Sequence, residues 1–436
     1  MLYINKFIVS SFFLLTSSFL SVAQTSREEL SAVKEKAGGN YYAYPTPSGK
    51  FTEVPAGYTP FYVSHYGRHG SRNMIDAVDS KVARDIMRQA DADGKLTKLG
   101  KQTLLYLDTI INNMDDRYGE LTQVGHNQHR SIARRMFNSF PQIFSGAISI
   151  DARSTNVHRC ILSMGAFCQE LKSLNPNLNI TNNASARDMF FMCNDTHLGA
   201  HKASDSQVRW NKMYNNFCEQ NAHPERLMKA LFTNPNYLKE DKAKSLSRKL
   251  FNIASDIQDM DGINFSLFPL FTDDELFGYW QSQNAFWFGW LGLQADQDTR
   301  DYEMACNLLR DILVKAEIAI ASKTPSATLR FGHDTGILPL IALMHVGNAY
   351  CRVSDLNNLY KSWADFKLIP MAANIQFIFY KNSVGNVLVK VLLNEEEVKL
   401  PLKTAGPYYQ WTEFQDYYEE VLSHIPNVRS SVKSTH

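Results

Sequence analysis

The chain has 436 residues, of which 44% are hydrophobic and 20% charged, which is the composition of a folded globular protein and excludes a disordered or fibrous one. Lysine and arginine total 45 against 44 aspartates and glutamates, so no overall basic charge exists to attract nucleic acid or an anionic membrane. A site for an anion must therefore be local, and the length allows two or three structural units.

The first 23 residues have the pattern of a secretory signal peptide. Lys6 precedes an apolar, hydroxyl-rich run over 7–20, and Ser21-Val22-Ala23 places small residues where a signal peptidase cleaves. Serine and threonine interrupt the run too often for a membrane anchor, and no later stretch is apolar enough to span a bilayer. We therefore expect an exported protein, periplasmic or extracellular, with no stable membrane span once residues 1–23 are removed.

Residues that bind metals or form disulfides give no clear pattern. The six cysteines are widely spaced without a CxxC pair, and the sequence does not decide between disulfides and buried free thiols. His126 and His129 stand at i, i+3 spacing, which fits either a metal site or a polar helix face. Because the chain has neither an HExxH run nor an Asp-rich loop, we expect no metal and no cofactor.

The first half of the chain predicts strands that alternate with helices. Residues 60–67 (PFYVSHYG) alternate aromatic and β-branched residues with small ones and run into glycines, as a strand before a tight loop does. Helical spacing of apolar residues follows over 94–115 and again over 122–137. A second strand is predicted over 147–152, followed by a helix over about 157–174.

The C-terminal part of the chain repeats this alternation. A third strand is predicted over 328–332, followed at once by a helix that includes 337–343. Two more strands, over 375–380 and 387–393, form a plausible hairpin. Repeated strand-helix units predict an α/β fold in which helices flank a central, mostly parallel sheet.

Between about 195 and 325 the strand signal disappears. This region is polar, rich in tryptophan and tyrosine, and helical by pattern. We expect it to form a mainly helical inserted subdomain that covers one end of an α/β core built from 24–194 and 326–436.

A charged loop, Gly67-Arg68-His69-Gly70-Ser71-Arg72, follows the first predicted strand. Gly70 lets the backbone approach a ligand without a Cβ in the way. The planar fork of an arginine matches phosphate oxygens, and backbone amides at the start of a following helix point the same way. The loop would cradle a phosphate; a surface turn with solvated arginines is the alternative interpretation.

The other two predicted strands also lead into charged residues. The second strand leads to Arg153, His158 and Arg159, and the third leads directly into His333-Asp334. Open α/β sheets bind ligands at the carboxyl ends of their strands. We therefore expect these residues to meet the charged loop at one site.

These residues resemble the motifs of the histidine phosphatase superfamily, in its acid phosphatase and phytase branch. The first motif of that family, RHGxRxP, is matched by RHGSRN at 68–73, with Met74 where proline is usual. HRCILSMGAF at 158–167 resembles the next arginine-bearing helix start, and GHDTGILPL at 332–340 resembles the late motif. The resemblance extends from about residue 55 to 425.

The resemblance implies a role for each matched residue. His69 would attack phosphorus to form a phosphohistidine, and Asp334 would give a proton to the leaving oxygen. The phosphate-binding residues would be Arg68, Arg72, Arg159 and His333. No metal is required for this chemistry, and the expected ligand is a small-molecule phosphate ester rather than nucleic acid.

The substrate is less closely indicated than the reaction. The segments LPLIALM and PYYQWTEFQDYYEEVL look similar to multiple inositol polyphosphate phosphatases, although those commonly carry His-Ala-Glu where this chain has His-Asp-Thr. We expect a secreted phosphomonoesterase for inositol polyphosphates such as phytate. A broad-specificity acid phosphatase for sugar or nucleotide phosphates is the alternative, and a binding protein without turnover would need neither His69 nor Asp334. The candidates for contacts with further phosphates are Arg153, His158, Lys202, Arg209 and Lys212.

Overall fold

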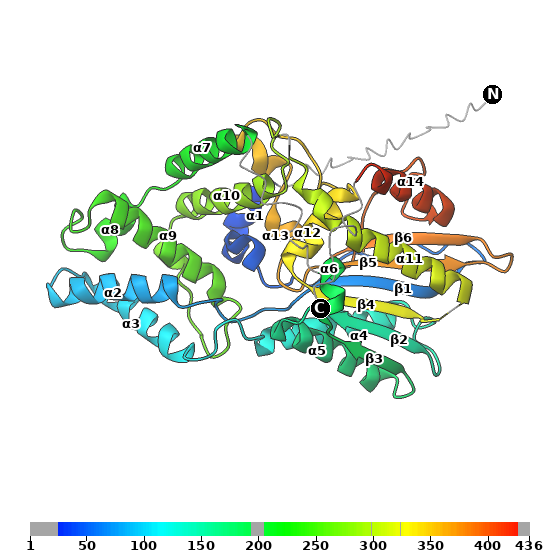
Figure 1. Cartoon of the computed structure of the whole chain (residues 1–436). Helices are drawn as coiled ribbons and strands as arrows, with labels where there is room; N and C mark the ends of the chain where they lie inside the picture. The colour runs from blue at the N-terminus through cyan, green and yellow to red at the C-terminus, as the bar shows by residue number, and fades with distance from the viewer. Residues whose placement is uncertain (1–24, 193–204, 298, 323, 426–436) are drawn as a thin grey trace, which may run out of the picture.

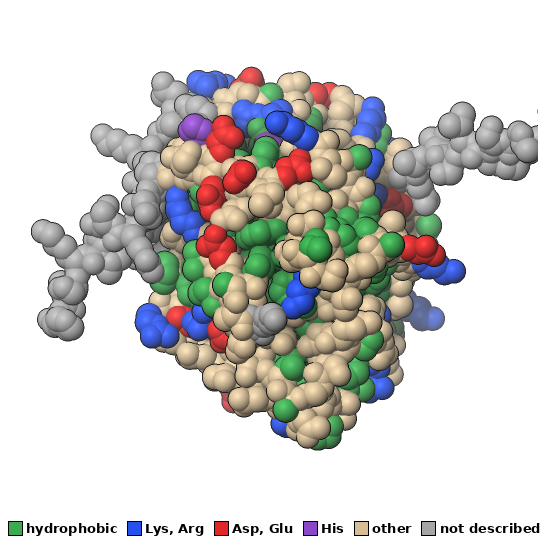
Figure 2. All heavy atoms as spheres, turned by 90° about the vertical axis from the view of Figure 1, so that its right-hand side faces the viewer, with side chains coloured by type: hydrophobic (Ala, Val, Ile, Leu, Met, Phe, Trp, Pro, Cys, Tyr) green, Lys and Arg blue, Asp and Glu red, His purple; other side chains and the backbone are tan. Residues whose placement is uncertain are grey.

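The structure is a computed structural model that describes residues 25–192, 205–297, 299–322 and 324–425 (Figure 1). The predicted signal segment lies outside these residues. Among the helices in the described ranges, none combines the length and the apolar character that a bilayer-spanning helix needs. Both basic and acidic side chains stand on the face shown in Figure 2.

Within the described residues, eight strands form one mixed sheet in the order β3-β2-β4-β1-β5-β6-β7, with β8 paired to β6. The strands are β1 (Thr59–Arg68), β2 (Ser149–Ser154), β3 (Asn179–Asn183), β4 (Ala327–Gly332), β5 (Asn374–Lys381), β6 (Val387–Leu393), β7 (Glu396–Glu397) and β8 (Tyr409–Gln410). β3, β2, β4 and β1 run parallel, whereas β5 to β8 pair antiparallel. The predicted α/β class with parallel central strands is therefore confirmed.

Helices cover both faces of this sheet and also form a separate group at one end (Figure 1). The α-helices are α1 (Ser26–Ala32), α2 (Val78–Ala92), α3 (Lys98–Asn113), α4 (Gln123–Ser139), α5 (His158–Leu174), α6 (Met189–Met192), α7 (Asp205–Gln220), α8 (Glu225–Leu231), α9 (Glu240–Ile257), α10 (Asp273–Trp290), α11 (Cys306–Ser322), α12 (Asp334–Leu343), α13 (Asp365–Leu368) and α14 (Trp411–Ser423). Short 3-10 helices are η1 (Lys34–Tyr41), η2 (Ala186–Asp188), η3 (Phe268–Leu270), η4 (Asp301–Ala305) and η5 (Leu356–Lys361).

Alternation along β1 separates the two cores that flank the sheet. Val63 faces α4 and α5 in one hydrophobic cluster, whereas Tyr62 and Tyr66 face α11, α12 and α14 in another. Because successive side chains of a strand point to opposite faces, the buried strand β1 contributes side chains to the hydrophobic cores on both faces of the sheet. β4 is buried along its whole length and lies next to β1.

A third hydrophobic cluster joins α2 and α3 to α8, α9 and α10. This helical unit thus combines helices that precede residue 195 with helices that follow it, while α11 packs on the sheet. The domain boundaries proposed at 195 and 325 remain a prediction. The unit lies beside the sheet on the side where α9, α10 and η1 approach the central strands (Figure 1).

The ends of some elements differ from the prediction because partners elsewhere in the chain set them. β2 extends over Ser149–Ser154 rather than 147–152, since Ser149 is the first residue opposite β3 and Ser154 still pairs with Phe331 of β4. α12 begins at Asp334, with His333 as its N-cap, earlier than the apolar run indicated. The cysteines that the structure describes are free thiols, namely Cys160, Cys168, Cys218, Cys306 and Cys351.

His129, one of the two candidate metal ligands, is a core residue. It lies on α4 with an exposed fraction of 1%, and its ring contacts Phe331. His65 of β1 is equally buried, between Phe167 and Phe331. Burial lowers the pKa of both histidines to about 3, so both rings are neutral in the folded protein.

We expect these two histidines to weaken the fold in acid. Their pKa is near 6.5 in the unfolded chain and about 3 in the folded one, so only the unfolded state gains protons between these values. Their contribution to stability is complete above pH 6.5 and falls as the pH drops toward 3, by about 1.4 kcal/mol per pH unit for each ring.

Urea unfolding of His129→Leu at several pH values between 7 and 4 tests this expectation. The free energy of unfolding should fall less steeply with acid than in the wild type, by about 1.4 kcal/mol per pH unit. His424→Gln, a change at an exposed histidine after α14, is the control and should keep the wild-type slope. An unchanged slope in His129→Leu would contradict the prediction.

Candidate active site

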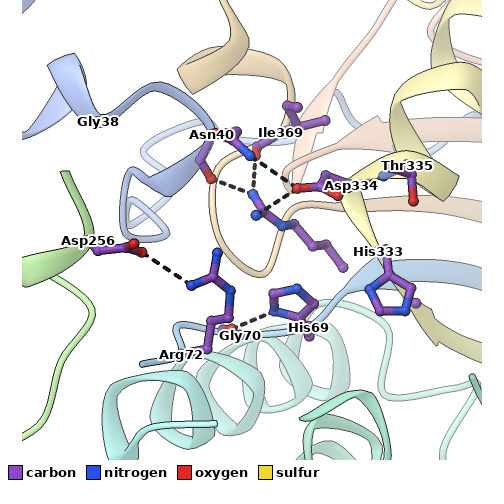
Figure 3. A network of polar contacts seen from close by, with 12 residues as sticks. Gly38, Asn40, His69, Gly70, Arg72, Asp256, His333, Asp334, Thr335 and Ile369 are labelled. Carbon is purple, nitrogen blue, oxygen red and sulfur yellow. Dashed lines mark hydrogen bonds and ion pairs between the residues drawn. The ribbon is translucent and has the colours of Figure 1, made fainter. Parts of the chain in front are cut away.

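The charged loop and the late motif meet because β1 and β4 are parallel neighbours. Their register sets Arg68, the last residue of β1, opposite Gly332, the last residue of β4. The backbone N–H of His69 donates to the carbonyl of Gly332 at 2.9 Å. The rings of His69 and His333 consequently lie side by side, with 5.6 Å between their centroids (Figure 3).

His69 is held with one ring nitrogen free. Its Nδ1 lies 2.9 Å from the carbonyl oxygen of Gly70, which can only accept, so Nδ1 carries the proton and Nε2 the lone pair. The pKa of His69 lies well below its usual value because of burial and then because of Arg68 and Arg159. A neutral imidazole with an available Nε2 is the form that acts as a nucleophile.

Arg68 is buried and bound on several sides. Its Nη2 forms an ion pair with Oδ2 of Asp334 at 2.8 Å, and Nη1 donates to the carbonyls of Ile369, at 2.7 Å, and of Asn40. Its Nε is buried and has no hydrogen-bond partner in the part of the chain that the structure describes. A buried guanidinium N–H without an acceptor is costly unless a ligand supplies one.

Arg72 and Arg159 add positive charge beside His69. Arg72 extends toward Asp256 of α9, with 3.2 Å between Nη1 and Oδ1 (Figure 3). Its guanidinium also lies over the ring of Tyr41. Arg159, in the first turn of α5, also has a buried Nε, for which no described residue is a hydrogen-bond partner. Burial lowers the pKa of the Arg159 guanidinium, and the neighbouring Arg72 acts in the same direction. Unpaired donors on two arginines indicate an anion site.

His333 lies beside His69 and lines the same cluster. Burial lowers its pKa to about 4, and Arg159 is the next cause. Its Nε2 lies 3.2 Å from the hydroxyl of Thr155, at the end of β2. Since Thr155 N–H donates to Phe331 of β4, the second and third predicted strands do meet at this place.

Asp334 stands at the first turn of α12 with each oxygen engaged. Oδ1 accepts the backbone N–H of Thr335 at 2.8 Å, and Oδ2 accepts from Arg68 and from Nδ2 of Asn40 at 3.1 Å. Burial raises its pKa, but Arg68, His333 and these hydrogen bonds outweigh burial, so the net pKa lies below the usual value. In the free protein Asp334 is therefore a carboxylate.

The five candidates for outer phosphate contacts lie in different environments. Arg153 forms ion pairs with Asp151 and Asp188, and the exposed His158 places Nε2 3.0 Å from the carbonyl of Gly119. Arg209 and Lys212 of α7 line a cavity of about 380 Å³ against residues 354–357. Lys202 lies outside the described residues. Their proposed role toward substrate remains a prediction.

A second cavity, of about 330 Å³, adjoins the arginines and contains residues that the sequence motifs did not indicate. Asn40 and Tyr41 of η1, Asp256 and Arg248 of α9, and Gln283 of α10 all line it. In the sequence, the glycine pair Gly38-Gly39 is the local feature that could have indicated an unusual turn beside Asn40. Gly39 has a φ of +59°, and a Cβ there would come within 2.5 Å of Asp365, so this turn requires glycine.

The sheet, its covering helices and the histidine-arginine cluster at the strand ends define a phosphoric monoester hydrolase of the histidine acid phosphatase type. The chain belongs to the histidine phosphatase superfamily (branch 2), whose model matches residues 67–394, more than half of the sequence. The resemblance drawn from the motifs is thereby confirmed.

Relatives and solved structures agree with this assignment. Multiple inositol polyphosphate phosphatase 1 of Homo sapiens is 25% identical over 419 residues, 86% of this chain and 81% of the human protein. The same enzyme of Gallus gallus is 22% identical over 409 residues, 86% and 85% of the two chains.

Among solved structures, the Bifidobacterium longum multiple inositol polyphosphate phosphatase in complex with inositol hexasulfate matches with a TM-score of 0.70 and 18% identity, over 88% of this chain and 97% of that one. The phytase of D. castellii matches with a TM-score of 0.67 and 14% identity, over 89% and 85%. At these identities the structures establish the shared fold.

Proposed function

We propose that this protein is an exported phosphatase that removes phosphate from inositol polyphosphates such as phytate through a phosphohistidine at His69. The observation that carries the proposal is the convergence of one neutral, buried histidine, one carboxyl group and several cations at the ends of β1 and β4. The relatives named for inositol polyphosphates support the substrate class. The pattern of residues 1–23 supports export.

The first half-reaction transfers the phosphoryl group to the protein. Arg68, Arg72 and Arg159 offset the negative charge of the phosphate, and together with His333 they hold it in line with His69. Nε2 of His69 attacks phosphorus, the N–P bond forms, and the ester P–O bond breaks. Asp334 gives its proton to the departing oxygen, so the leaving group departs as an alcohol.

The second half-reaction returns the protein to its starting state. The Asp334 carboxylate, having lost its proton, accepts one from a water molecule that attacks the phosphohistidine. The N–P bond breaks, inorganic phosphate forms, and His69 and Asp334 recover their original protonation. The net reaction consumes one water for each ester cleaved.

Substrate binding raises the pKa of Asp334, so that the carboxyl group takes up its proton from the solvent in acid. In the free protein Arg68 is the main group that holds the pKa of Asp334 down against burial. A bound phosphate group shares the donors of Arg68 and adds negative charge near the carboxyl, and both effects raise the pKa of Asp334. Activity is therefore expected on the acidic side of neutrality, where the bound complex carries a protonated Asp334.

A second candidate, a broad-specificity acid phosphatase, is favoured by one specific observation. The cavity beside the arginines is lined by Asp76, Asp79 and Asp256 as well as by Arg248. Carboxylates repel additional phosphate groups, and a substrate with a single phosphate would not meet them. Activity measurements must decide between the two substrate classes.

The mature protein should prefer phytate over glucose 6-phosphate and an aryl phosphate. Two outer charged hydrogen bonds, at about 1.5 to 3 kcal/mol each, correspond to a preference of about 100-fold or more in kcat/KM. The measurement is phosphate release by residues 24–436, without added metal, between about pH 3 and 7. Equal efficiency on all three substrates would replace the inositol polyphosphate assignment by the broad-specificity one.

Neutralising variants locate the outer contacts. Arg209→Gln with Lys212→Gln tests the predicted pair on α7, and Arg248→Gln tests the cavity beside the cluster. The variant that lowers kcat/KM for phytate but leaves kcat/KM for glucose 6-phosphate unchanged identifies the residues that contact the outer phosphates.

A further inference from the structure

The segment η1 brings an asparagine into the active site from outside the region that the family model matches. Asn40 is 3% exposed and lies between the helical unit and the ends of the central strands (Figure 3). Its backbone carbonyl accepts from Arg68, and its side-chain Nδ2 donates to Oδ2 of Asp334 at 3.1 Å. One residue thus contacts both members of the Arg68–Asp334 ion pair.

A glutamine of the helical unit fixes which way the Asn40 amide points. Nε2 of Gln283, on α10, donates to Oδ1 of Asn40 at 2.7 Å and also lies 3.3 Å from the carbonyl of Gly38. Since a glutamine Nε2 can only donate, the facing atom of Asn40 must be its oxygen. The nitrogen of the Asn40 amide is therefore directed at Asp334.

We propose that Asn40 is a positioning residue for the proton donor, oriented by Gln283; this inference rests on the phosphatase function proposed above. The hydrogen bond to Oδ2 and the backbone N–H of Thr335 on Oδ1 hold the carboxyl group of Asp334 from both ends. A carboxyl group held in this way keeps its plane when phosphate draws Arg68 away. A fixed plane aims the acidic proton at the leaving oxygen.

Leaving-group dependence distinguishes positioning of the acid from general support of the fold. An alkyl phosphate needs a proton on its basic leaving oxygen, whereas an electron-poor aryl phosphate departs with little help. Asn40→Ala should lower kcat on glycerol 2-phosphate by about 10- to 100-fold and kcat on p-nitrophenyl phosphate by less than about 3-fold, with KM little changed.

Two further variants keep the test independent of folding defects. Asn40→Asp preserves the side-chain volume but replaces the donor by a second carboxyl group, and it should reproduce the selective loss. Gln283→Leu removes the group that orients the amide and should give a smaller loss with the same dependence on the leaving group.

Asn284→Ala is the matched control. Asn284 is as buried as Asn40, and its side chain also makes two hydrogen bonds, to the carbonyl of Trp363 at 3.1 Å and from the N–H of Asp365 at 2.9 Å, rather than to Arg68 or Asp334. Any loss that it causes should be the same for both esters.

Two results would overturn the inference, and they differ from each other. Equal losses on alkyl and aryl esters in folded Asn40→Ala and Asn40→Asp would reduce Asn40 to a structural residue, while the proposed phosphatase function would stand. A wild-type protein that hydrolyses neither ester nor phytate would remove the proposed function and this inference with it.

Discussion

Replacing His69 by alanine should abolish turnover, with kcat falling by about four orders of magnitude or more, while the fold survives. In the proposed reaction the attacking atom is the ring Nε2, which nothing else in the described cluster replaces, because the His333 ring is 5.6 Å away and bound to Thr155. The backbone hydrogen bonds of His69, to Gly332 and from Ala372, do not depend on the side chain. Thermal unfolding and initial rates measured on the same preparation separate stability from catalysis.

Trapping the intermediate identifies the nucleophile directly. Wild-type protein mixed with labelled phosphate ester and quenched under denaturing alkaline conditions should carry the label on the peptide that contains His69. His126→Ala changes a histidine on the more exposed side of α4 and should keep both label and activity. A label on any other residue would overturn the assignment of His69.

Asp334→Asn should slow alkyl phosphates by about 10²- to 10⁴-fold and leave activated aryl phosphates nearly unchanged. The amide has the shape of the carboxyl group, and its oxygen can still accept from Arg68 and Asn40, but it carries no acidic proton. The measurement is kcat on a series of esters whose leaving groups span a range of basicity. The variant should show a much steeper dependence on that basicity than the wild type.

Asp256→Asn is the control for this second experiment. Asp256 is also a buried carboxyl group near the cluster, but it contacts Arg72 and not Asp334. In the proposed reaction Arg72 stabilises the transferring phosphoryl group whatever the leaving group is, so a loss in this variant should be equal across the series. If Asp334→Asn also gave equal losses, the proton would come from another group.

Much of the site could be predicted because its motifs are local. Arg68, His69 and Arg72 follow a strand pattern within a few residues, and His333-Asp334 follow another. Parallel strands end at the same edge of a sheet, so the two motifs could be expected to meet. The register of Arg68 against Gly332 agrees with that expectation.

Asn40, Asp256 and Gln283 could not be predicted in the same way. Each belongs to an element with no sequence motif, and each reaches the cluster only because α9 and α10 pack against η1, whose Asn40 contacts Arg68 and Asp334. The glycine pair before Asn40 indicated an unusual turn at most. Asp365, whose carboxyl group lies against Gly39 in the fold, is far away in the chain.

The sequence by itself determined the α/β pattern and the places of the charged loop after β1 and of the His-Asp pair, because periodicity and residue type act over a few neighbouring positions. Only the tertiary structure decided which charges are neutralised. Arg153 is paired with Asp151 and Asp188, and Arg72 reaches Asp256, whereas the buried Nε of Arg159 has no partner among the described residues. The physical reason is that an ion pair depends on the distance between two side chains, and that distance is set by the packing of elements remote from one another in the chain.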